Sequence, residues 1–263
     1  MGASTDPDHG EVTLDHDGPV AVITLNRPNA HNAMSIRMVR QLADITAAVR
    51  ADPDLRAVVI TGAGDRAFSA GGDLGELIPH LTAGELEVLI PDPSKRFFSD
   101  VYVPVIAAVN GLCVAGGLEV LLGTDIRISS ADAVFGLPEV KWGLIPGGGS
   151  HVRLPQQIGW PAAMHLLLTG ETIDAETALR LGLINEILPP ADVHARAMTV
   201  ANAIAANAPI AVRTAKEIAV KALANEPRFQ LETALNERVL ATNDAREGPA
   251  AFMERRSPDY QNR

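Results

Sequence analysis

Two glutamates of this chain occupy sequence surroundings that favour acid–base chemistry. Glu119 is predicted in the first turn of an apolar helix that runs from about Gly117 to Leu122. An ionised carboxylate is costly to bury among aliphatic side chains, so we expect the pKa of Glu119 to be raised. We favour a buried, functional Glu119 over a surface carboxylate that only complements the positive end of a helix. Glu139 follows Pro138 in a predicted loop, where a surface glutamate is the commoner outcome.

Two glycine-containing segments could present backbone N–H groups to an anionic oxygen. The run Phe68–Leu74 (FSAGGDL) follows a predicted strand, and its small residues allow a ligand to approach the backbone closely. A tight turn without a ligand is an equally good interpretation of this run. Gly116 and Gly117 stand at the start of the apolar helix, where N–H groups are unpaired and the helix dipole favours negative charge. A third run, Gly147–Gly149, indicates either a close backbone approach or local mobility.

Motifs for other kinds of catalysis are missing or weak. The sequence has no P-loop motif for phosphate, no zinc-type spacing of His, Cys and Glu, and its seven histidines are dispersed. Residues Gly62–Ala67 match the dinucleotide pattern G-x-G-x-x-A, but the residues that follow are not those of a continuing helix. We therefore expect neither a metal site nor a nucleotide-binding fold.

The candidate residues lie on a chain that alternates predicted strands and helices. A hairpin is predicted where two β-rich runs flank Asp17-Gly18, and Ser35 is predicted to cap a helix with apolar residues every three or four positions. The segment 75–100 has an irregular pattern. The predicted strands and later helices are Val12–Leu14, Val20–Leu25, Ala57–Thr61, Val105–Val109 and Ile126–Ser129, then Ala195–Ala206, Ile210–Ala224 and Arg228–Thr242. This order predicts an α/β layered core followed by helices, with a soft boundary near residues 195–205.

Composition and charge exclude several classes of protein. The 263 residues are 47% apolar and 21% charged, with a net charge of −10, which disfavours binding to nucleic acid or to anionic membrane surfaces. The most hydrophobic window, Val101–Gly123, contains Pro104 and Glu119, so we expect no membrane span. A single cysteine, Cys113, and a polar, acidic segment Met1–Gly10 without a signal-peptide pattern predict a cytoplasmic protein.

Taken together, several segments resemble the enoyl-CoA hydratase/isomerase (crotonase) superfamily. In chain order they are Ile23–Pro28 (ITLNRP) with Asn32–Ser35 (NAMS), Phe68–Leu74, Val109–Glu119, Phe135–Glu139 (FGLPE) with Pro146–Gly149, and Ala251–Arg256 (AFMERR). The resemblance runs in order from about residue 11 to the C-terminus, which makes it specific at the level of the superfamily.

The resemblance implies a fold, an assembly and a ligand. The implied fold is α/β, a crotonase-like spiral of ββα units with a C-terminal helical region that forms trimers, often paired as hexamers. We expect residues 1–198 to form the spiral acyl-CoA-binding and catalytic core, and residues 199–263 to form helices for oligomerisation and pocket completion. The implied substrate is an acyl-CoA thioester, with no cofactor besides the CoA that the substrate carries. A role in fatty acid metabolism such as β-oxidation would follow.

The resemblance also assigns residues. The two N–H groups that hold the thioester oxygen fall on Gly72 and Gly116, and the two glutamates of hydratases fall on Glu119 and Glu139. Adding water across an unsaturated thioester places negative charge on that oxygen, which two preorganised N–H groups stabilise. Glu119 is expected to activate the water and Glu139 to deliver the α-proton. The implied substrate-binding residues are Arg27, Asn29, Ala30, Ala70, Gly71, Asp73, Leu74, Gly117 and Phe252.

This chain departs from the family pattern at two positions, and three alternative functions remain open. Asn29 stands where many relatives carry Lys, so a charge contact to a CoA phosphate is lost there, and Ala115 stands where a third glycine is frequent. Retention of both glutamates favours hydration. The alternatives are double-bond isomerisation with a carboxylate at Glu139 alone, another crotonase reaction, and a CoA-thioester binding protein without turnover. Acyl specificity is expected in residues 75–100 and around Phe252.

Overall fold

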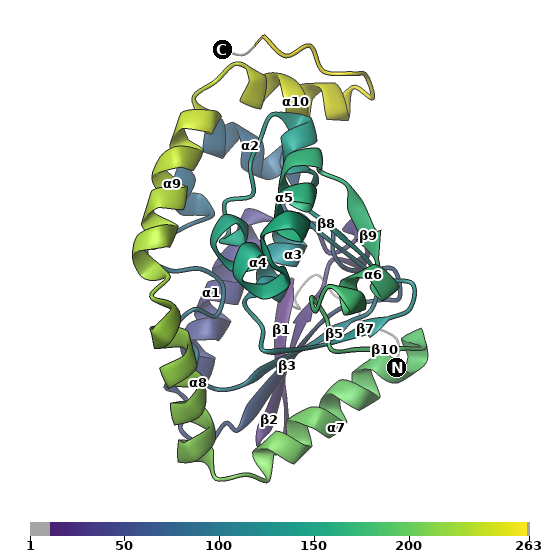
Figure 1. The fold of residues 1–263 in the computed structure, drawn as a ribbon, viewed down its shortest axis with the longest axis vertical. Coiled ribbons are helices and arrows are strands. Elements are labelled where there is room, and N and C mark those ends of the chain that lie inside the picture. Colours follow the sequence, from purple (N-terminus) through teal and green to yellow (C-terminus); the bar gives the residue numbers. More distant parts are fainter. Residues whose placement is uncertain (1–10, 262–263) are drawn as a thin grey trace.

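The strands of this chain form two sheets, shown in Figure 1, in a computed structural model that describes residues 11–261. The larger sheet has six strands in the order β1 (Val12–Asp17), β2 (Val20–Leu25), β3 (Ala57–Gly62), β5 (Val105–Val109), β7 (Ile126–Ser130) and β10 (Glu186–Leu188). The smaller sheet has four, in the order β4 (Ala67–Ser69), β6 (Leu112–Val114), β8 (Val134–Gly136) and β9 (Thr172–Asp174). Within each sheet the neighbouring strands are parallel, except for the antiparallel pairs β1–β2 and β8–β9.

The first unit of the fold follows directly from local sequence signals. The predicted hairpin is confirmed: β1 and β2 pair from Val12 opposite Leu25 to Asp17 opposite Val20. The predicted helix is α1 (Ile36–Ala51), and the Ser35 hydroxyl accepts a hydrogen bond of 3.0 Å from the N–H of Met38. The short polar cap side chain satisfies an N–H that the helix itself cannot pair.

Later units also have two strands and a helix, but each of them places one strand in each sheet. Strands β3 and β4 precede α2 (Leu74–Thr82), and β5 and β6 precede α3 (Gly116–Leu122). Strands β7 and β8 precede the 3₁₀ helix η3 (Pro138–Trp142) and α4 (Ser150–Ile158). The helix positions along the chain confirm the predicted spiral of ββα units. The helix α3 is buried on all sides, which the continuous apolar run around Glu119 predicts.

The remaining helices cover the sheets and extend from them. They are α5 (Trp160–Thr169), α6 (Ala175–Arg180), α7 (Val193–Ala205), α8 (Pro209–Leu223), α9 (Glu226–Leu240) and α10 (Asp244–Met253), with 3₁₀ turns at Pro28–Ala30 (η1), Leu86–Val88 (η2) and Pro190–Asp192 (η4). The small residues Ala197 and Ala201 let α7 pack closely on Val59 and Ile106 of the larger sheet. The expected boundary between residues 198 and 199 falls inside α7. In Figure 1, α8 and α9 run end to end along one edge of the molecule.

Two local expectations differ from the structure. The segment expected to be irregular begins with the helix α2, whose apolar residues Leu77, Ile78 and Leu81 pack in a core of their own. Glu139 lies on η3 rather than in an open loop, because Pro138 favours the first turn of a helix. The apolar window 101–123 folds as β5, β6 and α3, and no helix within residues 11–261 is long and apolar enough to cross a membrane.

Candidate active site

The two glutamates singled out from the sequence face one cavity. Glu119 on α3 and Glu139 on η3 both line a space of about 640 Å³. As predicted, Glu119 is buried. Glu139 Oε2 is also buried and has no hydrogen-bond partner among residues 11–261. An unpaired buried carboxyl oxygen is costly, and a ligand that bonds to it would recover that cost.

Burial raises the pKa of both carboxyl groups. The pKa of Glu119 rises to about 7, because burial and the nearby Glu232 carboxylate outweigh the hydrogen bond from Gly148 and the positive charges of His151 and Arg96. The pKa of Glu139 is raised well above its ordinary value, first by burial and then by the charge of Glu119. Since the two sites oppose ionisation together, the pair retains a proton near neutral pH.

A glycine turn holds one oxygen of Glu119. The N–H of Gly148 donates to Glu119 Oε1 at 2.5 Å, and the Ser150 hydroxyl donates to the same oxygen at 3.3 Å. A Cβ atom on Gly148 would lie only 2.6 Å from Glu119 Oε2. The run Gly147–Gly149 therefore serves a close backbone approach, one of the two interpretations that its sequence allowed. Gly148 and Ser150 were not predicted as partners of Glu119.

Two backbone N–H groups lie together on another side of the cavity. Gly72 follows β4 and Gly116 begins α3, and both residues line the cavity. Within the described part of the chain neither N–H donates to a protein acceptor. The two backbones lie close together, since a Cβ atom on Gly116 would lie 3.4 Å from the nitrogen of Gly72. Gly71 allows this contact: it has a φ of +93°, and a Cβ there would meet the Ala115 Cβ at 2.5 Å.

Side chains that sequence reasoning missed hold this backbone in place. The buried Asn32 donates from Nδ2 to the carbonyl of Ala67 at 2.8 Å, and its Oδ1 accepts from the N–H of Arg27 at 2.9 Å. The Ser69 hydroxyl donates to the carbonyl of Asn32 at 2.8 Å and accepts from the N–H of Gly71 at 3.1 Å. Asn32 begins the Asn32–Ser35 segment that carries part of the family resemblance, but its hydrogen bonds to the glycine turn were not predicted. These bonds fix the glycine turn before any ligand arrives, which is the condition for strong oxyanion binding.

Comparison with known proteins identifies the family of this chain. Residues 15–263 match the family model described as enoyl-CoA hydratase/isomerase. The enoyl-CoA hydratase EchA19 of Mycobacterium tuberculosis is 38% identical over 96% of this chain and 97% of its own. The chain belongs to the enoyl-CoA hydratase/isomerase, or crotonase, family.

Other relatives in this family cover almost the whole chain as well. The short-chain-enoyl-CoA hydratase of Clostridium acetobutylicum is 35% identical over 93% of this chain and 95% of its own. A crystal structure of a carnitinyl-CoA hydratase from Mycobacterium avium superposes with a TM-score of 0.85 at 36% identity, and the match covers 97% of this chain and all of the other. The crotonase fold is therefore shown, together with the acyl-CoA class of substrate that the family implies.

The other site residues expected from the crotonase pattern divide into two groups. Four line the cavity, namely Ala70, Asp73, Leu74 and Phe252. Five do not, namely Arg27, Asn29, Ala30, Gly71 and Gly117. Of these five, Asn29 and Ala30 lie on η1, beside the His31 carbonyl that accepts from the N–H of Ala70 at 2.9 Å.

The charge of Arg27 is already compensated within the protein. Its guanidinium lies 3.2 Å from an Asp73 carboxylate oxygen and 3.5 Å from a Glu11 oxygen, and it also donates to the carbonyl of Ala33 at 2.7 Å. A phosphate group would have to compete with two carboxylates for this cation. Gly117 serves close packing, because a Cβ atom there would lie 2.3 Å from the carbonyl oxygen of Ser69.

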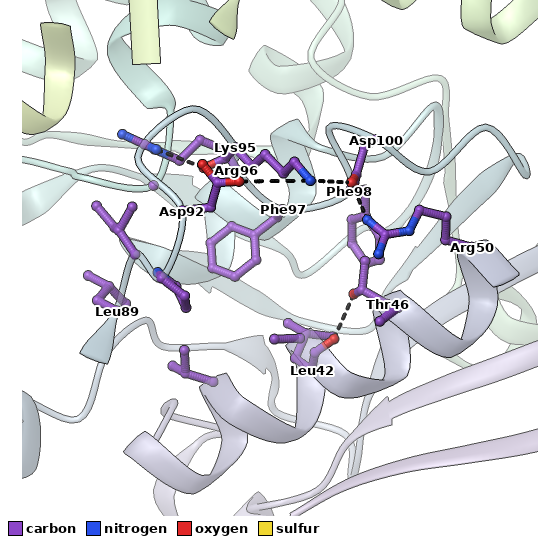
Figure 2. Close-up of a pocket in the computed structure, with 16 residues that line it drawn as sticks. Leu42, Thr46, Arg50, Leu89, Asp92, Lys95, Arg96, Phe97, Phe98 and Asp100 are labelled. Atoms are coloured by element: carbon purple, nitrogen blue, oxygen red, sulfur yellow. Dashed lines mark hydrogen bonds and ion pairs between the residues drawn. The ribbon is translucent and has the colours of Figure 1, made fainter. Parts of the chain in front are cut away.

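A second cavity adjoins the active-site cavity of this crotonase. It has a volume of about 210 Å³ and lies between α1 and the segment 89–100, as Figure 2 shows. Leu89 and Phe97 line both cavities, so their side chains form the wall between them. At the rim, the Asp100 carboxylate is ion-paired with Lys95 at 2.9 Å and with Arg50. Within the described residues no group of His, Cys, Asp and Glu side chains is suited to hold a metal ion.

Proposed function

We propose that this chain is an enoyl-CoA hydratase that adds water across the 2,3 double bond of a 2-enoyl-CoA to give a 3-hydroxyacyl-CoA. One observation carries the proposal. Two buried carboxyl groups with raised pKa values face the same cavity as two backbone N–H groups that have no acceptor among residues 11–261. Acid–base groups and an oxyanion site in one cavity are what conjugate addition to a thioester requires.

The reaction follows from these positions. The thioester oxygen accepts hydrogen bonds from the N–H groups of Gly72 and Gly116. Glu119, as carboxylate, takes a proton from water while the water oxygen bonds to C3, and the π electrons move onto the thioester oxygen as an enolate. The enolate then collapses as C2 takes a proton from Glu139. Burial raises the pKa of both carboxyl groups, so one of the pair can act as carboxylate while the other holds the proton that C2 receives.

The same proposal includes the assembly and the setting. A homotrimer, or a dimer of trimers, fits the exposed apolar side chains of the C-terminal helices, including Ile210, Ile218 and Leu231. A cytoplasmic role in fatty acid breakdown fits an enzyme of this chemistry. The named relatives act on short-chain enoyl-CoA and on carnitinyl-CoA, so the acyl group must be found by experiment.

The test is the loss of enoyl-thioester absorbance with short, medium and bulky 2-enoyl-CoA substrates. Wild type, Glu119→Gln and Glu139→Gln are compared, and each variant is expected to lose about 10²-fold or more in kcat. A Glu119→Gln variant that binds substrate without turnover also separates the enzyme from a CoA-thioester binding protein. The absence of hydration, with conversion of a 3-enoyl-CoA that depends on Glu139 alone, would replace the hydratase by the isomerase.

A further inference from the structure

A buried ion pair lies behind the glycine turn that contacts Glu119. Arg96 Nε lies 3.1 Å from Glu232 Oε2, and both side chains are only 2% exposed. Arg96 belongs to the segment that follows η2, whereas Glu232 belongs to α9 in the C-terminal region. Neither residue contacts the active-site cavity. A buried ion pair gains little stability over apolar residues of the same size, so stability alone does not account for it.

The ion pair is hydrogen-bonded to the glycine turn at both of its ends. Arg96 Nε also donates to the carbonyl of Gly147 at 3.0 Å. Glu232 Oε1 accepts a hydrogen bond of 3.2 Å from the N–H of His151. Between these two points lie Gly148 and Ser150, the two donors to Glu119.

The ion pair is itself fixed firmly. Arg96 Nη2 donates to the carbonyl of Phe229 at 2.9 Å and to the Thr233 hydroxyl at 2.7 Å, and both residues lie on α9. The guanidinium also lies 5.2 Å from the centre of the Phe229 ring. From the same helix Asn236 packs against the turn, since a Cβ atom on Gly147 would lie 2.6 Å from its Nδ2. The helix α9 therefore contacts the turn directly through Glu232 and Asn236, and it holds Arg96 through Phe229 and Thr233.

We propose that Arg96 and Glu232 are positioning residues that hold the Gly147–His151 turn so that the N–H of Gly148 stays directed at Glu119. The proposal rests on the proposed hydration for its kinetic readout. If so, the C-terminal helix α9 controls the position of a catalytic carboxyl group. The sequence had led us to expect that the C-terminal helices only complete the pocket and mediate association. A displacement of about 1 Å at such a group is enough to lower turnover by up to about 10²-fold.

The experiment compares wild type with Glu232→Gln and with the double variant Arg96→Met/Glu232→Met. The double variant removes both charges of the pair together, so neither partner is left as an unpaired buried charge, and the variant is expected to fold. Both variants are expected to lose about 10- to 100-fold in kcat on the best 2-enoyl-CoA, with KM changed by less than about threefold. A small change in KM is expected because the N–H groups of Gly72 and Gly116 are untouched.

The pH profile adds a readout that a merely structural role would not move. The charged groups that act on Glu119 are Glu139 on η3, Glu232 on α9, His151 and Arg153 on α4, and Arg96. Since the Glu232 carboxylate raises the pKa of Glu119, its removal in Glu232→Gln is expected to shift the acid limb of kcat/KM to lower pH. In the double variant the loss of Arg96 opposes this shift, so the limb is expected to move less.

Arg127→Lys provides the matched control. Arg127 is a buried arginine that donates to the carbonyl of Leu183 at 2.9 Å and to Gln157 Oε1 at 2.8 Å, and it makes no bond to the glycine turn. It is expected to lower the melting temperature without lowering kcat. Folded Arg96 and Glu232 variants that keep the wild-type kcat and pH profile would overturn the proposal. Should wild type show no hydration, the proposed function fails by itself. In that case amide hydrogen exchange at residues 147–151 tests the positioning role. Exchange that is accelerated in the double variant at these residues more than elsewhere supports this role, and exchange that is unchanged from wild type overturns it.

Discussion

Glu119 and Glu139 are expected to reduce the stability of the folded protein as the pH rises. Folding raises the pKa of Glu119 from an ordinary value of 4.5 to about 7, and it raises the pKa of Glu139 well above 4.5. Above pH 4.5 the unfolded chain has lost a proton that the folded chain still binds, so this contribution to stability is fully present below pH 4.5 and declines as the pH rises. Glutamine at position 119 is expected to raise the free energy of unfolding by about 1–3 kcal/mol at about pH 8, and by less near pH 5, and glutamine at position 139 is expected to change it in the same direction.

Urea denaturation of wild type, Glu119→Gln and Glu139→Gln at both pH values measures this effect. The unfolding slope m of each protein serves as the control, because an unchanged m shows that the variants unfold from the same compact state. A stability gain of equal size at the two pH values would contradict the raised pKa values.

Gly148→Ala is expected to displace the Glu119 carboxyl group and lower turnover by about 10²-fold. The added Cβ atom would lie 2.6 Å from Glu119 Oε2 and 2.8 Å from its Cδ, so the carboxyl group must move. Gly182→Ala is the control, because it has a φ of +78° with nothing within 4 Å of the added atom. It is expected to cost about 1 kcal/mol in stability through backbone strain and to leave turnover unchanged. Steady-state kinetics and thermal unfolding of both variants measure the two effects, and wild-type turnover in Gly148→Ala would show that Glu119 tolerates displacement.

The longer strands and helices could be predicted because each of them leaves a local signal in the sequence. The cap at Ser35 and the apolar runs located α1 and five of the six strands of the larger sheet. The three-residue strands β4, β6, β8, β9 and β10 were not predicted, because so short a run leaves no clear pattern. The aliphatic neighbours of Glu119 likewise indicated its burial. No such signal marks Arg96 and Glu232, which lie 136 positions apart and meet only when α9 returns to the glycine turn. A single sequence shows which residues suit a buried helix, but not which distant side chain will pair with them.

The wall between the two cavities belongs to the segment 89–100, where acyl specificity was expected. Phe97→Ala is expected to join the cavities and to raise the ratio of kcat/KM for a medium-chain over a short-chain 2-enoyl-CoA by about tenfold, since each additional buried methylene group contributes binding energy. Val39→Ala is the control, because Val39 lines only the second cavity. Val39→Ala enlarges the second cavity without opening the wall, so the ratio of kcat/KM for the medium-chain over the short-chain substrate is expected to equal that of wild type. An unchanged ratio in Phe97→Ala would mean that the acyl chain leaves the active site by another route.

In the whole molecule, α8 stands out as a helix that buries no apolar face against the rest of the chain. None of its 15 residues is buried, although Arg213 donates to the carbonyl of Leu55 at 2.5 Å and Lys216 to that of Val103 at 3.0 Å. Ile210 and Ile218 on this helix are 80% and 64% exposed. Most helical stability in proteins comes from burying an apolar face, so a helix of this kind requires a further partner. The proposed trimer supplies one in the form of a second copy of the chain.

The double variant Ile210→Glu/Ile218→Glu is therefore expected to shift the solution mass from that of three or six chains toward that of one. Two carboxylates at an apolar contact each lose hydration on association, and together they cost several kcal/mol. Light scattering coupled to gel filtration measures the mass. Ala195→Glu, which adds a charge to an exposed position of α7, is the control and is expected to keep the wild-type mass. Phe252 and Met253 line the active-site cavity while their side chains remain about half or more exposed, so a neighbouring chain could cover them. A dissociated variant with a raised KM would then connect the assembly to the acyl pocket, whereas a variant that keeps its mass would exclude α8 from the contact.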